Sequence, residues 1–414
     1  MSWRCLLAVC SLLFPVCAFA QYEISVTEIT VWVRVLDSSD NPIKGLVKED
    51  FEIFEDGKMQ PLTCFQERDS EEVEEAITTQ EKIDVTASIP PRRFVLFLDL
   101  FNTSPPEYLR VRAKMEEFLN QIKGKNWEVM LAALTDKAEL GVIAPFTSNF
   151  AVIRTLLLKA PANGMRDVRT RNNLRDIRQL LEHALEWGGD IDDPIRRAYQ
   201  LAQIYSKEEE ERSELSVEAL ESFAAHLIKE RSGEEHTAIV YVSGGFNAEP
   251  GRQYFEIIND FLEKLGQKFD PVEFAMRFPR SSSETKFEIR RMIKNSVGKL
   301  NKQNITLYTI NTRGMYDAGD NIDIANSTLV QFDHSFLQDY QESLAQIAEE
   351  TGGISFQNSQ NFKKGLDLIL TDLSHQYEMC YSASNRKTAG KYRKIEVRVK
   401  RPGARVRHRK GYVN

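Results

Sequence analysis

One serine stands where a nucleophile for acyl transfer would be placed. Ser243 follows an apolar run at 238–242 and precedes Gly244 and Gly245, the order of a buried strand that ends in a tight turn. Serine hydrolases of the α/β type hold their nucleophile in such a turn, within a Gly-x-Ser-x-Gly pattern. The first glycine of that pattern is absent, because Tyr241 stands there. We expect the two glycines to let the chain leave the strand sharply, and a serine hydrolase that uses Ser243 stays as one alternative.

Other chemical signatures are missing from the sequence. None of the six histidines forms the His-x-x-x-His pair of a helical zinc site. Asp317, Asp320 and Asp323 lie three residues apart, without the alternating spacing of a calcium loop, so we expect an acidic surface loop there. The glycine patterns that cradle phosphates are also absent. The sequence therefore predicts a protein that is not an enzyme and has no catalytic residues.

Strands and helices that alternate along the chain would position these residues. A continuous apolar run predicts a buried strand at 94–98, and largely apolar runs predict further strands at 129–134, 238–242 and 305–310. Apolar residues at helical spacing lie between or after these strands, at 105–122, 150–158, 336–347 and 362–373. Such alternation produces βαβ units. The expected fold class is α/β, with a doubly wound, mostly parallel sheet.

A strongly helical stretch separates two of the predicted strands. It covers about 165–232 and is too long for one crossover helix, so we expect a helical insertion of two or three helices over one sheet edge. A second, less regular insertion is expected at 271–283. The main domain, with both insertions, is predicted to cover 92–375.

Short strand patterns flank this domain on both sides. Residues 21–67 predict an N-terminal β module, 68–91 an acidic linker, and 376–414 basic C-terminal strands that pack with the N-terminal module into a β-sandwich. A shared module would bring Cys64 and Cys380 together, and one disulfide between them is one prediction. Two separate buried thiols are the alternative, since pairing needs Cα atoms within about 7 Å.

The N-terminal 20 residues have the layout of a secretory signal peptide. Arg4 precedes an apolar run, and Ala18 and Ala20 provide small residues for cleavage. No run reaches the roughly 20 apolar residues of a transmembrane helix. We expect an exported chain, periplasmic or secreted, that begins near Gln21 and has no transmembrane segment.

Charge is unevenly distributed along the chain. The net charge is -7, which gives no reason to expect nucleic-acid binding. The tail at 386–410 is nevertheless strongly basic, with Glu396 as its one acidic residue. We expect the solvated face of edge strands there, where cations discourage pairing with other chains. An anionic surface or polysaccharide partner is the alternative.

Several short motifs together resemble one protein family. They are 35–57, with its Asp40-Asn41-Pro42 turn; a strand ending in Asp99; 241–245; Ile347-Ala348-Glu349-Glu350-Thr351-Gly352-Gly353; Tyr377 with Tyr381; and 409–412. In order and spacing they resemble von Willebrand factor A (vWA)-related proteins of the acidobacterial type, over nearly the whole mature chain. The resemblance implies a vWA fold, export and no catalytic activity.

The resemblance also implies where a metal and a partner would bind. Adhesive vWA domains hold a divalent cation with an Asp-x-Ser-x-Ser loop, a threonine and a second aspartate. Here Asp99 and Thr103 match, but Phe101 replaces the middle ligand and Gly244 replaces the second aspartate. Thr170 is the one candidate for the threonine.

We therefore expect a degenerate metal site and no cofactor, the alternative being Mg²⁺ or Ca²⁺ at Asp99 and Thr103. The partner-binding surface, called the apex here, is predicted to comprise Asp99, Asn102, Thr103, Ser104, Ser243, Gly244 and Gly245.

The function expected is that of an exported, non-enzymatic protein of the interaction or adhesion type. Its partner would be an unknown protein or cell-surface ligand that contacts the apex and the helical insertion. The alternative from another class is a structural component of the cell envelope, anchored by its β module and basic tail.

Overall fold

The computed structural model of the 414-residue chain describes residues 28–69, 92–123, 126–160, 166–186, 191–230, 236–266, 276, 286–313, 330–357, 362–383 and 390–413. The predicted signal peptide, most of the acidic linker and most of 271–283 lie outside these residues, as do Asp317, Asp320 and Asp323. No helix in the described part of the chain is long and apolar enough to cross a membrane.

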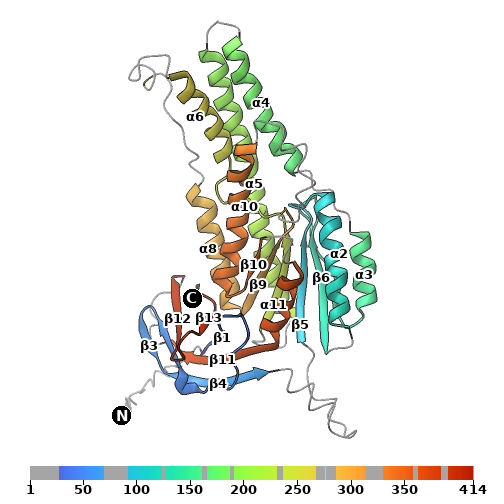
Figure 1. Ribbon diagram of the computed structural model, residues 1–414, viewed down its shortest axis with the longest axis vertical. Coiled ribbons are helices and arrows are strands. Elements are labelled where there is room, and N and C mark those ends of the chain that lie inside the picture. The colour runs from blue at the N-terminus through green and yellow to red at the C-terminus, as the bar shows by residue number, and fades with distance from the viewer. Residues whose placement is uncertain are drawn as a thin grey trace, which may run out of the picture.

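A six-stranded mixed sheet forms the centre of the molecule (Figure 1). Its strand order is β10-β9-β8-β5-β6-β7; β7 pairs antiparallel with β6, and the other pairs are parallel. The strands are β5 (Arg92–Asp99), β6 (Trp127–Leu134), β7 (Leu140–Thr147), β8 (Thr237–Ser243), β9 (Ile305–Asn311) and β10 (Ser355–Phe356). The four predicted apolar runs lie in β5, β6, β8 and β9, because helices cover both faces of these strands.

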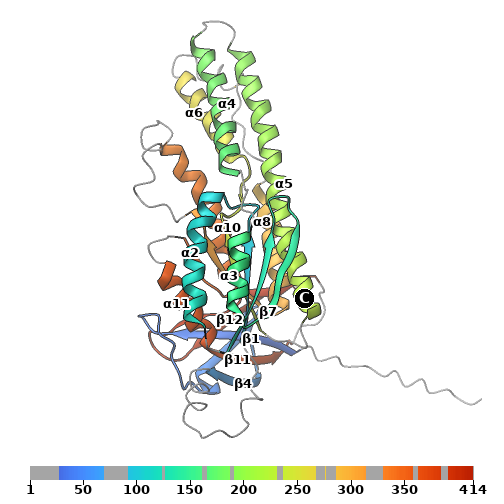
Figure 2. The ribbon, with the colours of Figure 1, turned by 90° about the vertical axis from the view of Figure 1, so that its right-hand side faces the viewer.

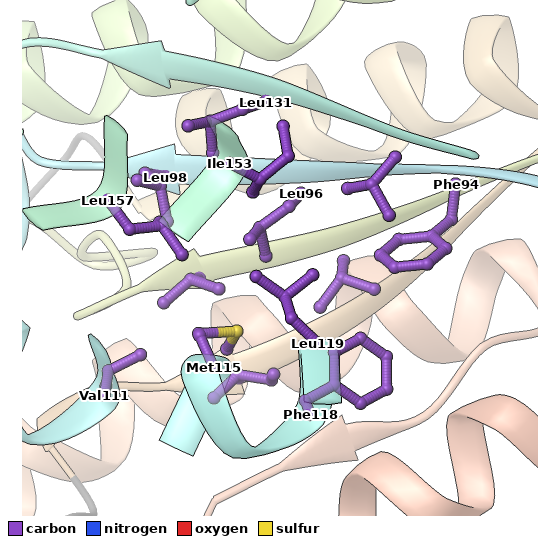
Figure 3. Close-up of a cluster of buried hydrophobic side chains, with 14 of the residues drawn as sticks. Phe94, Leu96, Leu98, Val111, Met115, Phe118, Leu119, Leu131, Ile153 and Leu157 are labelled. Carbon is purple, nitrogen blue, oxygen red and sulfur yellow. The ribbon is translucent and has the colours of Figure 1, made fainter. Parts of the chain in front are cut away.

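The helices divide between the two faces of the sheet. On one face, Leu96 and Leu98 of β5 pack with Met115 and Phe118 of α2 and with Ile153 of α3 (Figure 3). The helices there are α2 (Pro105–Gln121), α3 (Phe150–Lys159) and α11 (Phe362–Ser374). The other face packs against α5 (Asp192–Glu230), α8 (Lys286–Lys302) and α10 (Val330–Thr351). The fold is therefore α/β, with a mixed sheet between two layers of helices.

A helical arm projects from one end of the sheet (Figures 1 and 2). It consists of α4 (Arg166–Glu186), α6 (Arg252–Gly266) and the N-terminal half of α5. These helices share an apolar core of their own, which includes Ile177, Ala198 and Ile258. The sequence predicted an insertion over 165–232 alone; α6 joins it because its apolar residues face α4 and α5. With 39 residues, α5 is about 58 Å long at 1.5 Å per residue and continues from the arm to the sheet.

A β-sandwich built from both ends of the chain lies at the opposite end of the sheet (Figure 1). One layer has the order β13-β1-β11-β4 and the other β14-β12-β2-β3. The strands are β1 (Glu28–Leu36), β2 (Phe51–Glu55), β3 (Lys58–Gln60), β4 (Leu62–Asp69), β11 (His375–Ser382), β12 (Tyr392–Val399), β13 (Arg405–Arg407) and β14 (Gly411–Val413). Alternate residues of both layers, such as Val31, Val33, Ile53 and Ile395, form its core.

A tight hairpin follows β2. Asp56 and Gly57 have φ values of 49° and 77° and form its turn. The strand that returns from the turn and pairs with β2 is β3. The chain then crosses to the other layer as β4, which places Cys64 directly opposite Cys380 of β11. These two cysteines form a disulfide, with Cα atoms 4.8 Å apart.

The basic tail is less solvated than the sequence predicted. Arg393 is buried and its Nη1 donates to Glu55 at 2.7 Å. Arg407 pairs with Asp372 of α11, and Arg409 donates to the backbone oxygen of Thr30 at 2.6 Å. Several tail cations thus hold the sandwich together or attach it to the α/β sheet, because carboxylates and carbonyl groups from distant segments face them. A sequence pattern could not show these partners.

Candidate functional site

The strand order of the sheet reverses between β5 and β8. From β5 it proceeds to β6 and β7 on one side and to β8, β9 and β10 on the other. Ligands of α/β sheets commonly bind at such a point, beyond the carboxyl ends of the strands. Two segments follow these strand ends, 100–104 and 244–251, and are called the apex loops here. Any ligand site of the sheet is therefore expected between them.

Asp99 lies at the centre of this region and is fully buried. It follows Val95 and Phe97 at a spacing of two, so its side chain faces the layer of α5. Its Oδ2 accepts hydrogen bonds from the hydroxyls of Tyr241 and Ser243, both at 2.6 Å, and a further bond from the Asn102 amide. Its Oδ1 accepts the backbone N–H of Asn102 at 3.0 Å. The carboxylate therefore joins the ends of β5 and β8.

The first apex loop is held by α5. The Asn102 amide donates to Ser216 Oγ at 2.8 Å, and Ser216 itself is fully buried. One turn earlier, Arg212 donates to the backbone oxygen of Phe101 at 3.0 Å and stacks on its ring at 4.2 Å. The phenylalanine that replaces an expected metal ligand thus contacts a cation of the arm helix.

The second apex loop is held by the same face of α5. Ser213 donates to the backbone oxygen of Asn247 at 2.9 Å, and Ser206 donates to that of Pro250 at 2.9 Å. With Glu209 and Ser216, these serines form a polar stripe at helical spacing. Below this stripe the same helix turns apolar and packs on the sheet. The middle turns of α5 therefore contact the apex loops, and its later turns pack on the strands.

Glu209 is the central residue of the joint between arm and sheet. It is 6% exposed, and its carboxylate accepts donors from α4, α6 and the second apex loop. The donors are Thr170 Oγ1 at 3.4 Å, Asn247 Nδ2 at 3.1 Å, Gly251 N at 3.2 Å, Gln253 Nε2 at 2.8 Å and Tyr254 Oη at 2.7 Å. Burial and the neighbouring carboxylate raise the pKa of Tyr254, so this hydroxyl stays a donor. A single buried carboxylate thus orders three segments.

The two glycines after β8 are required by close packing. A Cβ at Gly244 would lie 2.2 Å from the backbone oxygen of Asn102. Gly245 has φ +76°, and a Cβ there would lie 2.5 Å from the backbone oxygen of Tyr340. A larger residue at Gly244 would push the two apex loops apart, and one at Gly245 would push the second loop away from α10.

The apex residues are brought together, but they are not open to a partner. Asp99 bonds to both Asn102 and Ser243, whereas Thr103 follows Asn102 with a buried hydroxyl that has no hydrogen-bond partner in the described structure. Ser104 caps α2, its backbone N–H donating to Glu107 at 2.8 Å. Six of the seven apex residues are buried and Ser104 is half-buried, because α5 covers them.

These residues do not fit a divalent cation. Three donors already bond to Asp99 Oδ2, and the backbone N–H of Asn102 bonds to Oδ1. The candidate Thr170 lies on α4 and donates to Glu209. Within the described ranges, no three His, Cys, Asp or Glu side chains converge as metal ligands would. A cation would have to displace the hydroxyls of Tyr241 and Ser243.

The Ser243 hydroxyl is also hydrogen-bonded within the chain. It donates to Asp99 and accepts the backbone N–H of Gly245 at 2.9 Å. Activation as a nucleophile needs a general base within hydrogen-bond reach. The acceptor within reach of Ser243 is the buried Asp99 carboxylate, which also accepts from Tyr241 and Asn102, and no histidine among the described side chains bonds to Ser243.

Sequence reasoning missed Tyr241 and Glu209 as members of this site. Tyr241 is a polar residue inside an apolar strand, two positions before Ser243 and therefore on the same face. Glu209 lies within a run of charged residues at 207–212. Its helical spacing from Ser213 and Ser216 was the sequence feature that could have placed it on the same face of the helix.

Comparisons with known proteins identify no family. No protein-family model matches the chain, and no curated protein matches it significantly. Among solved structures, it is similar to the pilus adhesin SpaC from Lactobacillus rhamnosus GG in the open conformation, with 8% sequence identity and a TM-score of 0.31. The match covers 92% of this chain but 48% of the adhesin, so the chain spans about half of that protein's length. A TM-score this low supports no conclusion about fold family or function.

Proposed function

We propose that the protein is an exported, non-enzymatic binding protein whose α/β domain is of the vWA type. We also propose that it meets a protein or cell-surface ligand through the helical arm. The vWA assignment is supported by the sequence motifs and by the strand order, with one antiparallel edge strand and helices on both faces.

One observation carries the proposed role of the arm. The polar stripe of α5 occupies the edge of the sheet where α/β proteins bind ligands, and Asp99 and Glu209 are satisfied by groups of the chain itself. We infer that the sheet supports the arm and holds it in a fixed orientation. A projecting arm of three helical segments with its own apolar core provides surface for a macromolecule rather than a pocket for a metabolite.

Export is supported by the Cys64–Cys380 disulfide. Disulfides that are part of a fold persist in oxidising compartments such as the periplasm or the extracellular space. Together with the N-terminal sequence pattern, the bond favours a periplasmic or secreted protein. The proposed binding requires no cofactor.

A paired set of surface variants tests the role of the arm. Arg175 and Ile204 are exposed on α4 and α5, and the change Arg175→Glu with Ile204→Asp alters the charge and polarity of the arm without touching its core. The matched control, Arg401→Glu with Met59→Asp, makes the same kinds of change on the exposed sandwich. Each protein is used to capture partners from the envelope fraction of its source cells.

The proposal predicts that the arm pair loses the partner retained by the native chain, while the sandwich pair keeps it. Loss with the sandwich pair alone would contradict the proposal. It would favour the structural envelope component anchored through the β module.

A further inference from the structure

The first and last described strands of the chain lie in the β-sandwich, and the Cys64–Cys380 disulfide joins β4 of its N-terminal part to β11 of its C-terminal part. We infer that the sandwich with Cys64–Cys380 is a clasp that carries tension applied between the two chain ends, so that the α/β sheet and the arm stay unloaded. This inference does not depend on which partner the arm binds.

The topology of the disulfide is the first argument. The two cysteines are 316 residues apart in sequence. Every strand of the central sheet and every helix from α2 to α11 lies between them, within the closed loop. Among the described elements, β1, the short helix Lys48–Asp50, β2 and β3 lie wholly outside the loop on one side, and β12, β13 and β14 on the other. Over the described residues, the covalent path from 28 to 413 through the disulfide therefore runs within the sandwich.

The loop also leaves and re-enters the sandwich at one place. Asp69 at the end of β4 pairs with His375 at the start of β11. Five residues from Asp69, Cys64 pairs with Cys380 in the same ladder. The disulfide therefore holds the two strands that connect to the sheet side by side, and a pull on the chain ends cannot separate them.

The strands that receive the load are paired with neighbours, β1 on both of its edges and the edge strand β14 with β12 alone. The N-terminal side enters through β1, which lies between β11 and β13. The C-terminal side ends in β14, beside β12, which itself lies between β14 and β2. The backbone hydrogen bonds of these strand pairs resist the pull at first, and the disulfide limits how far the chain can extend.

The two load paths differ greatly in length. With the bond intact, residues 28–64 and 380–413 extend by at most about 250 Å at roughly 3.5 Å per residue. Opening the bond releases the loop defined by the 316-residue separation, which adds about 1,100 Å at the same rise.

Single-molecule stretching of the mature chain between handles at its two ends tests the clasp. The oxidised protein should lack the extra extension of about 1,100 Å, and added reductant or the change Cys64→Ser with Cys380→Ser should produce it. A second variant, Glu209→Gln, weakens the joint of the arm. It should leave the oxidised trace unchanged and lower the unfolding force of the reduced chain.

Oxidised molecules that extend by the full length would overturn the inference. A shift of their trace by Glu209→Gln would overturn it as well, since the arm would then bear load. The use of reductant on the already folded native chain keeps the test valid even where the cysteine variant fails to fold.

Discussion

Replacement of Glu209 by alanine is the sharpest perturbation of the arm joint. The change removes the acceptor for buried donors on α4, α6 and the second apex loop, while the helix itself tolerates alanine well. A buried donor left without an acceptor costs roughly 1–3 kcal/mol. At least three such donors, on Gly251, Gln253 and Tyr254, lose their partner. We therefore expect a loss in the free energy of unfolding on the order of 4 kcal/mol.

The assay is thermal unfolding followed by far-UV circular dichroism, which reports mainly on helices. A loss of this size lowers Tm by on the order of 10 °C. Glu209→Gln keeps one acceptor oxygen and should lose about half as much. The matched control is Glu211→Ala, an exposed position on the same helix, which should stay within about 0.5 kcal/mol of the native protein. Equal Tm values for Glu209→Ala and Glu211→Ala would refute the account of the joint.

Three further predictions concern the sandwich and the apex. Reduction of Cys64–Cys380 should lower the free energy of unfolding by about 3–5 kcal/mol, seen as a lower Tm with reductant; an unchanged Tm would contradict it. Burial lowers the pKa of His408 to about 4, so its contribution to stability is complete above pH 6.5 and is lost as pH falls toward 4. His408→Gln should flatten the pH dependence of Tm over that range, and an identical slope would count against it. Tyr241→Phe and Ser243→Ala should each lower the free energy of unfolding in urea by about 1–2 kcal/mol. Mg²⁺ or Ca²⁺ should leave the Tm of the native protein unchanged. A rise in Tm with either ion that Ser243→Ala abolishes would show a metal site instead.

Local pattern was sufficient for much of the sheet. Runs such as 94–98 and 129–134 are apolar at every position, and only a strand covered on both faces requires that. The start of α2 was equally clear, because the two prolines at 105 and 106 favour the first turn of a helix.

The burial of the apex could not be read from local pattern. It depends on one hydrogen bond between Asn102 and Ser216 and on another between Ser213 and Asn247, each linking distant segments. The sequence marked an insertion but not the direction in which it folds. Likewise, Arg393 and Arg409 look like surface cations until the strands bring Glu55 and Thr30 to them.

Hydrogen–deuterium exchange of the two apex loops tests the central claim most directly. Their backbone N–H groups donate to buried acceptors: Asn102 to Asp99, Gly245 to Ser243, and Gly251 to Glu209. If the sheet edge is a closed seat for the arm, peptides covering 100–104 and 244–251 should exchange as slowly as the core strand β8. Exchange of these peptides within seconds, with β8 still protected, would show an apex open to solvent and would contradict the account.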